Sequence, residues 1–393
     1  MRGREAVSRG LQGSRHYELP ALGAAIVAAC VPAFAQAQQS GSTRPAVLEE
    51  IVVTATKREE RLFEVPLSVT ALSGEDLARR QWLSLADIVG QVPGLSLQQT
   101  SATRNRIIIR GQNAGSAGAT VATVIDEVPF SKSNALSEGG LTSADFYTYD
   151  MERVEVLRGP QGTLYGANAV GGLIKYVTRA PELDAFGASV EASAYNVADG
   201  GTGGSVRGWV NAPLGATVAL RLVGFAEQIP GWSDNWILGQ KDADEGRRSG
   251  GRASLLWKPS DALSVRGTVA YNERTADSPT FVNVFGQPGG AAVVPANRFD
   301  LPRGRSFGTY VPQEEEAQQL NTYLNVQWDF GAGTLTSISS YGTQKNLSGI
   351  DASGTLAAPG VNLLAAVAVA LKSQPITATR GSDIDTDKYS QEF

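Results

Sequence analysis

The second half of the chain alternates apolar and polar residues with a period of two, and this pattern limits its fold more than any other feature. In the run 318–330, Leu324, Val326 and Trp328 alternate with polar residues. Because a strand places successive side chains on opposite faces, the pattern predicts long β-strands with one apolar and one polar face. Such strands suit a membrane barrel with a wet lumen, and they also suit a soluble β-sandwich.

The lengths of the connections between these strands separate the two folds. Outer-membrane barrels have short turns on one side and long loops on the other, whereas compact soluble domains rarely contain loops longer than about 15 residues. An eighth strand is expected to begin near Lys388. The seven expected before it are 187–196, 204–210, 218–227, 250–257, 264–273, 318–330 and 334–345. After the first connection, 197–203, which is short, the connections alternate between short (211–217, 258–263, 331–333) and long (228–249, 274–317, 346–387). The alternation favours a barrel.

The N-terminus has the three parts of a secretory signal peptide. Four arginines lie within residues 1–17, the apolar run 21–35 follows, and Ala33-Phe34-Ala35 ends it with a small-x-small cleavage pattern. This run is too short to span a bilayer, as is every later apolar run, so a membrane-spanning part of this chain must be a β-barrel. We predict a signal peptide over 1–35. The alternatives are a buried N-terminal helix and a lipoprotein signal ending at Cys30.

Rare residues and charge exclude several kinds of function. Cys30 and His16 are the only cysteine and histidine, and both lie within 1–35. The mature chain would therefore lack a disulfide, a Cys or His catalyst and an ordinary zinc or haem site. A net charge of -5 argues against nucleic acid as a partner. No nucleophile elbow or phosphate-binding loop is present, so neither an enzyme nor a cofactor is indicated.

The segment before the alternating half predicts a linker and then a compact unit. Residues 36–60 are expected to be a flexible linker, in which β-branched Ile51–Thr54 forms a short strand suited to pairing with another sheet edge. An ordinary edge strand of the next domain is the alternative. Ser73 is expected to cap a helix, and 84–89 to form a second one. The expected strands of this α+β unit, 61–183, are 107–109, 121–125, 154–157 and 174–177.

Several motifs resemble those of TonB-dependent outer-membrane receptors. The run Glu152–Gly166 is the most specific of them, because its glycines, Pro160 and charges recur together in this family. Lys175-Tyr176 depart from the family, in which Asn followed by Ile is commoner. The other matching stretches are Glu50–Arg58, Val65–Ser73, Val92–Leu95, Ile109–Gly111, Ile125–Pro129 and Gly171–Thr178.

The resemblance implies an α+β plug domain at 61–183, followed at 184–393 by the N-terminal part of an antiparallel transmembrane β-barrel. The chain would supply about seven or eight of about 22 strands, so we expect it to be part of a longer receptor. By itself, this chain could not close a barrel. The protein would lie in the outer membrane of a Gram-negative cell, in contact with lipid. The implied TonB box, which adds a strand to the periplasmic protein TonB, comprises Glu50, Ile51, Val52, Val53, Thr54 and Ala55.

The function implied by the resemblance is proton-gradient-driven uptake of a scarce ligand, most often a ferric siderophore. Uptake of cobalamin, a glycan or another nutrient is the alternative. A signal-transducing receptor is disfavoured because only 36–48 precede the box, and a passive porin is disfavoured by the plug and the box.

Candidate site residues fall into three groups. The family places arginines such as Arg110 and Arg158 against glutamates of the barrel wall, and Glu392 is a candidate glutamate; solvated plug charges are the alternative. Aromatic residues in the long loops could hold a ligand or only pack the loops. They are Trp232, Trp236, Phe281, Phe285 and Tyr310. The acidic runs 242–245 and 383–387 resemble calcium loops, but neither completes an EF-hand.

Cleavage is expected after Ala35, because Ala33-Phe34-Ala35 presents small residues at the two positions that signal peptidase reads. N-terminal sequencing of the protein from outer membranes should begin at Gln36. A lipid-modified Cys30 at the N-terminus would contradict this prediction.

Overall fold

The structure is a computed structural model. It describes residues 52–58, 60–99, 103–112, 118–129, 145–166, 168–235, 239–277, 306–307, 314–351 and 379–392. The chain divides into two units, Met1–Leu48 and Glu49–Phe393, and every described residue belongs to the second. The predicted signal peptide and the first two residues of the predicted TonB box, Glu50 and Ile51, lie outside the described residues. The expected domain boundaries therefore stay a prediction.

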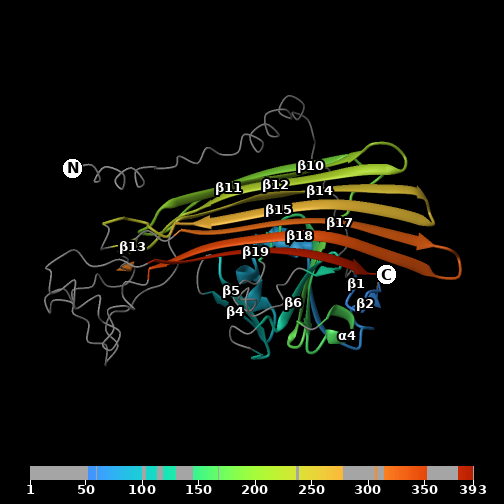
Figure 1. Cartoon of the computed structure of the whole chain (residues 1–393). Coiled ribbons are helices and arrows are strands. Elements are labelled where there is room, and N and C mark those ends of the chain that lie inside the picture. The colour runs from blue at the N-terminus through green and yellow to red at the C-terminus, as the bar shows by residue number, and fades with distance from the viewer. Residues whose placement is uncertain are drawn as a thin grey trace, which may run out of the picture. The chain divides into compact units, whose positions relative to one another are not determined.

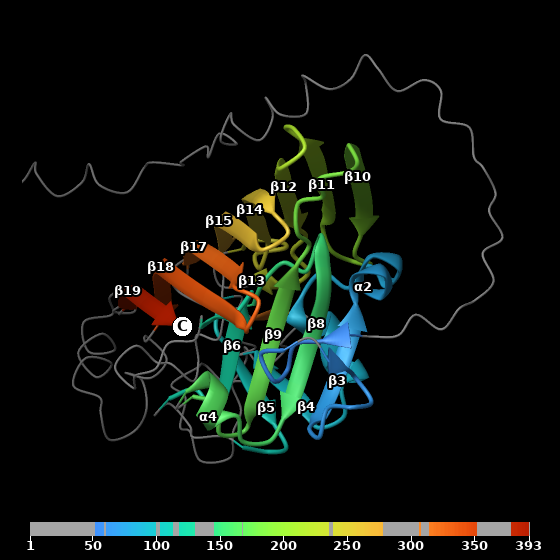
Figure 2. The same cartoon turned by 90° about the vertical axis from the view of Figure 1, so that its right-hand side faces the viewer.

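A small mixed sheet forms the centre of residues 52–178, which we call the plug unit (Figure 2). Its strands β6 and β9 are parallel, and the other pairs are antiparallel. The order is β3 (Ser68–Ser73), β8 (Met151–Arg158), β9 (Gly172–Thr178), β6 (Val121–Ile125) and β7 (Val128–Pro129). Two small ladders join β1 (Val52–Val53) to β2 (Glu60–Arg61) and β4 (Leu95–Gln99) to β5 (Asn105–Ile109). The helices are α2 (Gly74–Arg80), α3 (Leu85–Ile88), the 3-10 turn η1 (Val89–Gln91) and α4 (Gly162–Tyr165).

Both predicted helices form at their expected caps. Ser73 Oγ accepts the N–H of Asp76 at 3.1 Å, which satisfies one of the free donors at the start of α2. Ser84 and Asp87 form a reciprocal capping box at the start of α3. Among the described residues, no helix has the length and apolar content needed to cross a bilayer.

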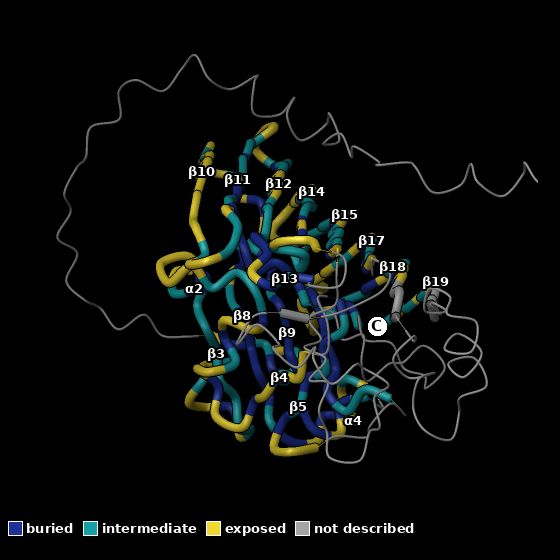
Figure 3. The backbone as a smooth tube through the Cα atoms, turned by 90° about the vertical axis from the view of Figure 1, so that its left-hand side faces the viewer, coloured by how far each residue is buried: buried dark blue, intermediate teal, exposed yellow. Residues whose placement is uncertain are grey.

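Two apolar clusters cover the two faces of the plug sheet, and they appear as the dark strands of Figure 3. One cluster joins the helices to Val154, Val156, Ile174 and Tyr176. The other contains Val53 and Ala55 and is formed with Val65, Ala122, Val124, Leu157, Ala169 and Leu173. The segment expected to be a mobile tail therefore packs on the plug sheet from Val53 onward.

An eight-stranded antiparallel sheet, which we call the wall sheet, follows in chain order (Figure 1). This arrangement confirms the predicted fold class of a plug followed by barrel-type strands. The strands are β10 (Gly187–Asn196), β11 (Thr202–Pro213), β12 (Val218–Ile229), β14 (Gly246–Ser260), β15 (Leu263–Ala276), β17 (Glu315–Asp329), β18 (Thr334–Asp351) and β19 (Thr379–Glu392). A parallel two-residue pair, β13 (Asp234–Asn235) with β16 (Ser306–Phe307), lies outside this sheet.

The wall sheet has the predicted period-two pattern and the predicted difference between its ends. One end has short connections at 214–217, 261–262 and 330–333, and we call it the short-turn end. The other end has the long connections 230–245, 277–314 and 352–378 and one short connection, 197–201. Leu255, Val269 and Leu324 are exposed on the outward face, whereas Ser254 and Thr268 are buried on the inward face. Aromatic residues stand exposed at the short-turn end, as in the interfacial girdle of a membrane barrel. They are Trp257, Trp328 and Phe330.

Strand β19 begins at Thr379, earlier than the expected start near Lys388. The prediction was late because this part of β19 is polar on both faces, so it lacks the alternation that marks the other strands. The acidic run 383–387, considered above as a calcium loop, lies inside this strand and pairs with 343–347 of β18. An extended strand does not curl its side chains around one ion as an EF-hand loop does.

Gly74 permits close contact between α2 and β8. A Cβ atom at this position would lie 2.0 Å from the carbonyl oxygen of Met151, whereas one at Gly90 would meet no atom within 4 Å. We expect Gly74→Ala to destabilise the plug unit by about 1–3 kcal/mol through overpacking, and Gly90→Ala to have little effect. Proteolysis of the plug unit in isolated outer membranes measures both. Equal resistance of the two variants would contradict the packing described here.

Candidate functional site at the interface of the plug unit and the wall sheet

Asp150 joins the plug unit to two strands of the wall sheet. Arg221 of β12 donates to both of its carboxylate oxygens, at 2.9 and 2.6 Å. Arg252 of β14 donates to Asp150 Oδ2 at 2.7 Å and to its backbone carbonyl at 2.8 Å. Arg221 and Asp150 are almost fully buried, with side chains 1% and 2% exposed. A buried charge without a partner is strongly destabilising, so each of these residues depends on the others.

Asp126 makes the second buried connection. Arg266 of β15 and Tyr323 of β17 donate to its Oδ2 at 2.6 and 2.7 Å, and the N–H of Thr178 donates to Oδ1 at 2.8 Å. Burial by itself would raise the pKa of Asp126, but the Arg266 charge and the hydrogen bonds from Thr178 and Tyr323 outweigh it and lower the pKa. Asp126 therefore contributes stability above the ordinary pKa of a carboxyl group, and this contribution is lost as the pH falls through the lowered pKa.

Further contacts lie toward the long-loop end of the wall sheet. Arg248 and Arg274, which face each other across β14 and β15, approach the same carboxylate of Asp145 at 3.6 and 3.8 Å. The buried carboxylate of Glu315 on β17 accepts the N–H and the hydroxyl of Thr103 at 3.1 and 2.9 Å. Charged groups of β12, β14, β15 and β17 therefore contact the plug unit, and so does Arg207 of β11, which donates to the Tyr147 hydroxyl at 3.4 Å.

The arginines expected at this interface have other contacts. Arg158 Nη1 donates to the carbonyl oxygen of Pro93 at 3.3 Å, and Arg110 is exposed beside Gly94. Their pairing with wall glutamates stays a prediction. Glu392 of β19 does contact the plug unit, but its ion pair is with Lys57 rather than with either arginine.

The ion pairs at Asp126 and Asp150 have the polarity opposite to the expected one. Here the wall sheet supplies the arginines and the plug unit supplies the carboxylates. Sequence reasoning missed Arg221, Arg252 and Arg266 as partners, although each lies at an inward position of a predicted strand. A cation is stable at such a buried position only if an anion pairs with it. An arginine at an inward strand position was therefore the sequence signal that could have indicated a carboxylate partner on the plug unit.

The predicted TonB box segment lies against the plug sheet. Val52 and Val53 pair with Arg61 and Glu60, and Val53 is fully buried. The N–H of Thr54 donates to Glu155 Oε1 at 2.9 Å, and Lys175 Nζ donates to the Thr54 carbonyl oxygen at 2.9 Å.

Two neighbouring side chains complete this contact. The hydroxyl of Tyr165 donates to the carbonyl oxygens of Thr54 and Ala55 at 3.3 and 3.1 Å, and burial raises its pKa. Lys57 lies over the Tyr165 ring, and burial lowers the pKa of this lysine although the nearby Glu127 opposes the shift. Because Glu392 lies near the start of β18, its pairing with Lys57 places the box at the short-turn end of the wall sheet.

Most of the expected ligand-loop residues lie outside the described residues, namely Trp236, Phe281, Phe285 and Tyr310. Trp232 is partly exposed, and Asp244 Oδ1 accepts the N–H groups of Trp232 and Ser233 at 2.7 and 2.8 Å. Asp244 therefore organises this loop. Among the described residues, no group of three or more His, Cys, Asp or Glu side chains has a geometry that could hold a metal ion.

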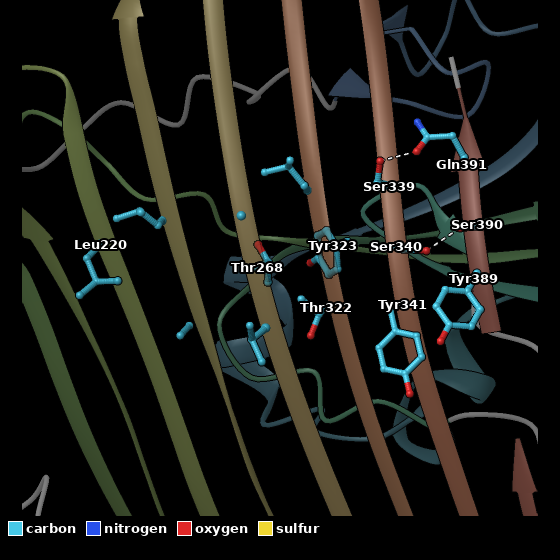
Figure 4. Close-up of a pocket in the computed structure, with 15 residues that line it drawn as sticks. Leu220, Thr268, Thr322, Tyr323, Ser339, Ser340, Tyr341, Tyr389, Ser390 and Gln391 are labelled. Atoms are coloured by element: carbon cyan, nitrogen blue, oxygen red, sulfur yellow. Dashed lines mark hydrogen bonds between the residues drawn. The ribbon is translucent and has the colours of Figure 1, made fainter. Parts of the chain in front are cut away.

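A shallow hollow crosses the wall sheet from β12 to β19 (Figure 4). Outward Leu255, Val269 and Leu324 contribute to it, and Tyr341 and Tyr389 stack near its edge with ring centroids 4.8 Å apart. The described residues that line it carry no Asp, Glu, Lys or Arg. This lining suits hydrocarbon better than a polar ligand.

Residues 61–173 match the protein family described as TonB-dependent Receptor Plug Domain. The match covers the plug sheet except for most of β9, of which it includes only Gly172 and Leu173. These residues are therefore a plug domain of the TonB-dependent receptor type. The chain is 32% identical over 136 residues to the vitamin B12 transporter of Vibrio vulnificus, and the match covers 34% of this chain and 21% of that protein. It is 32% identical over 157 residues to the hemin receptor of Yersinia pestis, covering 39% of this chain and 22% of that receptor.

Solved structures show the same fold at lower identity. The ferric yersiniabactin uptake receptor of Yersinia pestis has a TM-score of 0.57 at 18% identity, covering 72% of this chain and 42% of that one. The ferric-catecholate import receptor of E. coli K12 has a TM-score of 0.58 at 17% identity, covering 84% of this chain and 46% of that one. The chain thus spans less than half the length of each of these proteins.

Replacing Asp150 tests the connection between plug and wall. Asp150→Ala leaves Arg221 and Arg252 buried without a carboxylate, so we expect a loss of about 3–5 kcal/mol in stability. Asp261→Ala, in an exposed turn, is the matched control and should change stability by less than about 0.5 kcal/mol. Thermal unfolding of the purified receptor measures both, and a similar small effect of the two substitutions would contradict the role given to Asp150.

Proposed function

We propose that this receptor takes up a ferric siderophore across the outer membrane and that TonB drives the uptake. The observation that carries the proposal is the position of the predicted TonB box. Its strand β1 is held by only two residue pairs and lies at the short-turn end of the wall sheet, which is the periplasmic end in outer-membrane barrels. TonB is a periplasmic protein, so the box lies on the side from which TonB approaches.

The plug unit supports an energised rather than a passive route. It packs against the inward face of the wall sheet through the buried ion pairs of Asp126 and Asp150. A ligand passing along this face requires the plug unit to move or rearrange. Breaking buried ion pairs costs several kcal/mol, so this step calls for an external source of work.

TonB would bind by strand addition. In this mode the backbone N–H and C=O groups of an extended segment pair with the edge of a second sheet. The β-branched residues Val52, Val53 and Thr54 favour the extended conformation that the pairing needs. We propose export by the signal peptide 1–35 as the route to the outer membrane.

The names of the relatives support an iron-containing ligand. They include an iron-regulated outer membrane virulence protein of Vibrio cholerae, the ferric yersiniabactin receptor and the ferric-catecholate receptor. The vitamin B12 transporter and the hemin receptor favour cobalamin or haem as the second candidates. We place the ligand site among the long loops, with Trp232 as its described member.

Growth on single nutrients distinguishes these ligands. A strain lacking the gene should fail to grow on one ferric siderophore as its only iron source, and the gene supplied on a plasmid should restore growth. If the deletion strain fails to grow only when haem, or only when cobalamin, is the supplied nutrient, then that compound is the ligand instead of a siderophore.

Substitutions at Val52 test coupling to TonB. Proline removes a backbone N–H and resists a paired strand, so we expect Val52→Pro to abolish uptake. Val52→Thr keeps the N–H and the β-branched shape, so its effect should be mild. Ligand bound at the cell surface and ligand accumulated in the cell are measured in parallel, and both variants should bind ligand normally. Normal accumulation in Val52→Pro cells would refute the TonB mechanism.

A further inference from the structure

The turn between β6 and β7 contains an unfavourable residue choice. Asp126 and Glu127 are its two central residues, and both have positive φ, 43° and 73°. A two-residue hairpin with positive φ at both positions favours glycine at the second, because a side chain there meets the backbone. A residue other than glycine is disfavoured in this conformation, because its Cβ atom crowds the following carbonyl oxygen. Glu127 therefore requires a compensating interaction.

The compensating interaction is an ion pair with Lys175. The Glu127 carboxylate pairs with the Lys175 ammonium group, whose side chain is only 1% exposed. Two locally unfavourable choices, a glutamate at positive φ and a buried lysine, thus satisfy each other.

Lys175 also contacts the predicted TonB box. Its Nζ donates to the Thr54 carbonyl oxygen, while Glu155, its cross-strand neighbour, accepts the Thr54 N–H. Arg153 in turn pairs with Glu155 at 2.7 Å. The two backbone groups of Thr54 that strand addition would use are therefore already bonded within the plug unit. Thr54 cannot pair with a second sheet until Glu155, Lys175 and the Tyr165 hydroxyl release it.

The same turn reaches the wall sheet. Asp126, the neighbour of Glu127 in the chain, accepts from Arg266 of β15 and Tyr323 of β17. A continuous series of contacts therefore runs from Arg266 through the Asp126–Glu127 turn to Lys175 and then to Thr54. The series contains two largely buried ion pairs, Arg266 with Asp126 and Glu127 with Lys175, and the two carboxylates are on neighbouring residues of one turn. A shift of the turn at one pair therefore changes the geometry at the other.

We propose that the Glu127–Lys175 ion pair is a latch that keeps the box in the plug unit, and that the Asp126–Glu127 turn links this latch to the wall sheet at Arg266. The proposal rests on the proposed function, because release of the box has a purpose only if TonB binds it. It adds the residues that set the release, which neither the box sequence nor the plug fold indicates.

Thiol labelling measures release of the box directly. The substitution Val53→Cys is made in the chromosomal gene, and outer membranes are isolated from that strain. Because Val53 is fully buried, the new thiol should react slowly with a maleimide. Adding Lys175→Met or Glu127→Gln should increase the labelling rate roughly tenfold, the change that about 1.4 kcal/mol of lost protection gives. The double variant should label no faster than Lys175→Met alone. Lys175→Arg keeps the charge and should remain slow, and Lys258→Met, at the exposed end of β14, is the matched control.

A second variant tests the link to the wall. Arg266→Met should increase labelling of the Val53→Cys thiol when Glu127 is present and should add nothing when Glu127→Gln is already made. Equal, additive effects in both backgrounds would overturn the link.

A second thiol separates release from unfolding. Val92 is buried in the other apolar cluster of the plug unit, so a Val92→Cys thiol should stay protected in every latch variant. Unchanged labelling at position 53 in Lys175→Met would overturn the latch, and so would simultaneous exposure of positions 53 and 92. The membranes contain neither ligand nor an energised TonB system, so the labelling outcomes do not depend on uptake. Normal uptake in Val52→Pro cells would therefore refute the proposed function without changing the labelling result.

Discussion

Buried charge is the constraint on which the rest of this structure depends. The wall sheet carries arginines on its inward face, and two of them, Arg221 and Arg252, meet the single carboxylate of Asp150. A buried guanidinium without an anion is unstable, so the wall sheet needs the plug unit as much as the plug unit needs the wall. The position of the plug unit against the wall sheet, and with it the place of the Asp126 turn, depends on this docking.

This constraint also ranks the possible movements. Removing the whole plug unit would leave Arg221, Arg252 and Arg266 without their carboxylates at the same time. Freeing the box breaks two strand pairs and the bonds of Thr54, and exposes the small side chain of Ala55 together with Val53. The local movement costs much less than the global one. A pull from the periplasm would therefore act on the box first, before the ion pairs of Asp150 are broken.

Local patterns made much of the fold predictable. The cap at Ser73 and the capping box at Ser84 depend on neighbours three residues away, and both helices formed where expected. The strand predicted at 121–125 has the observed bounds, and so does 187–196. Predictions were poorer where the local signal is weak: β19 is polar on both faces, and β3 and β4 were not predicted at all. The ends of barrel strands lie beyond the hydrocarbon, where no apolar face is required, so alternation fades there.

Local patterns were sufficient to predict the order of the two units, the faces of the wall strands and the resemblance to a plug domain, because strand periodicity, helix caps and short motifs are properties of neighbouring residues. Which charges meet became known only from the folded chain. Arg110 and Arg158 were expected at the wall, yet the ion pairs at Asp126 and Asp150 take their arginines from the wall itself. The burial of Val53 against the plug sheet and the pairing of Glu127 with Lys175 were also decided there. The physical reason is that an ion pair depends on distance in space, and the two members of each of these pairs lie far apart in the chain, where no local pattern connects them.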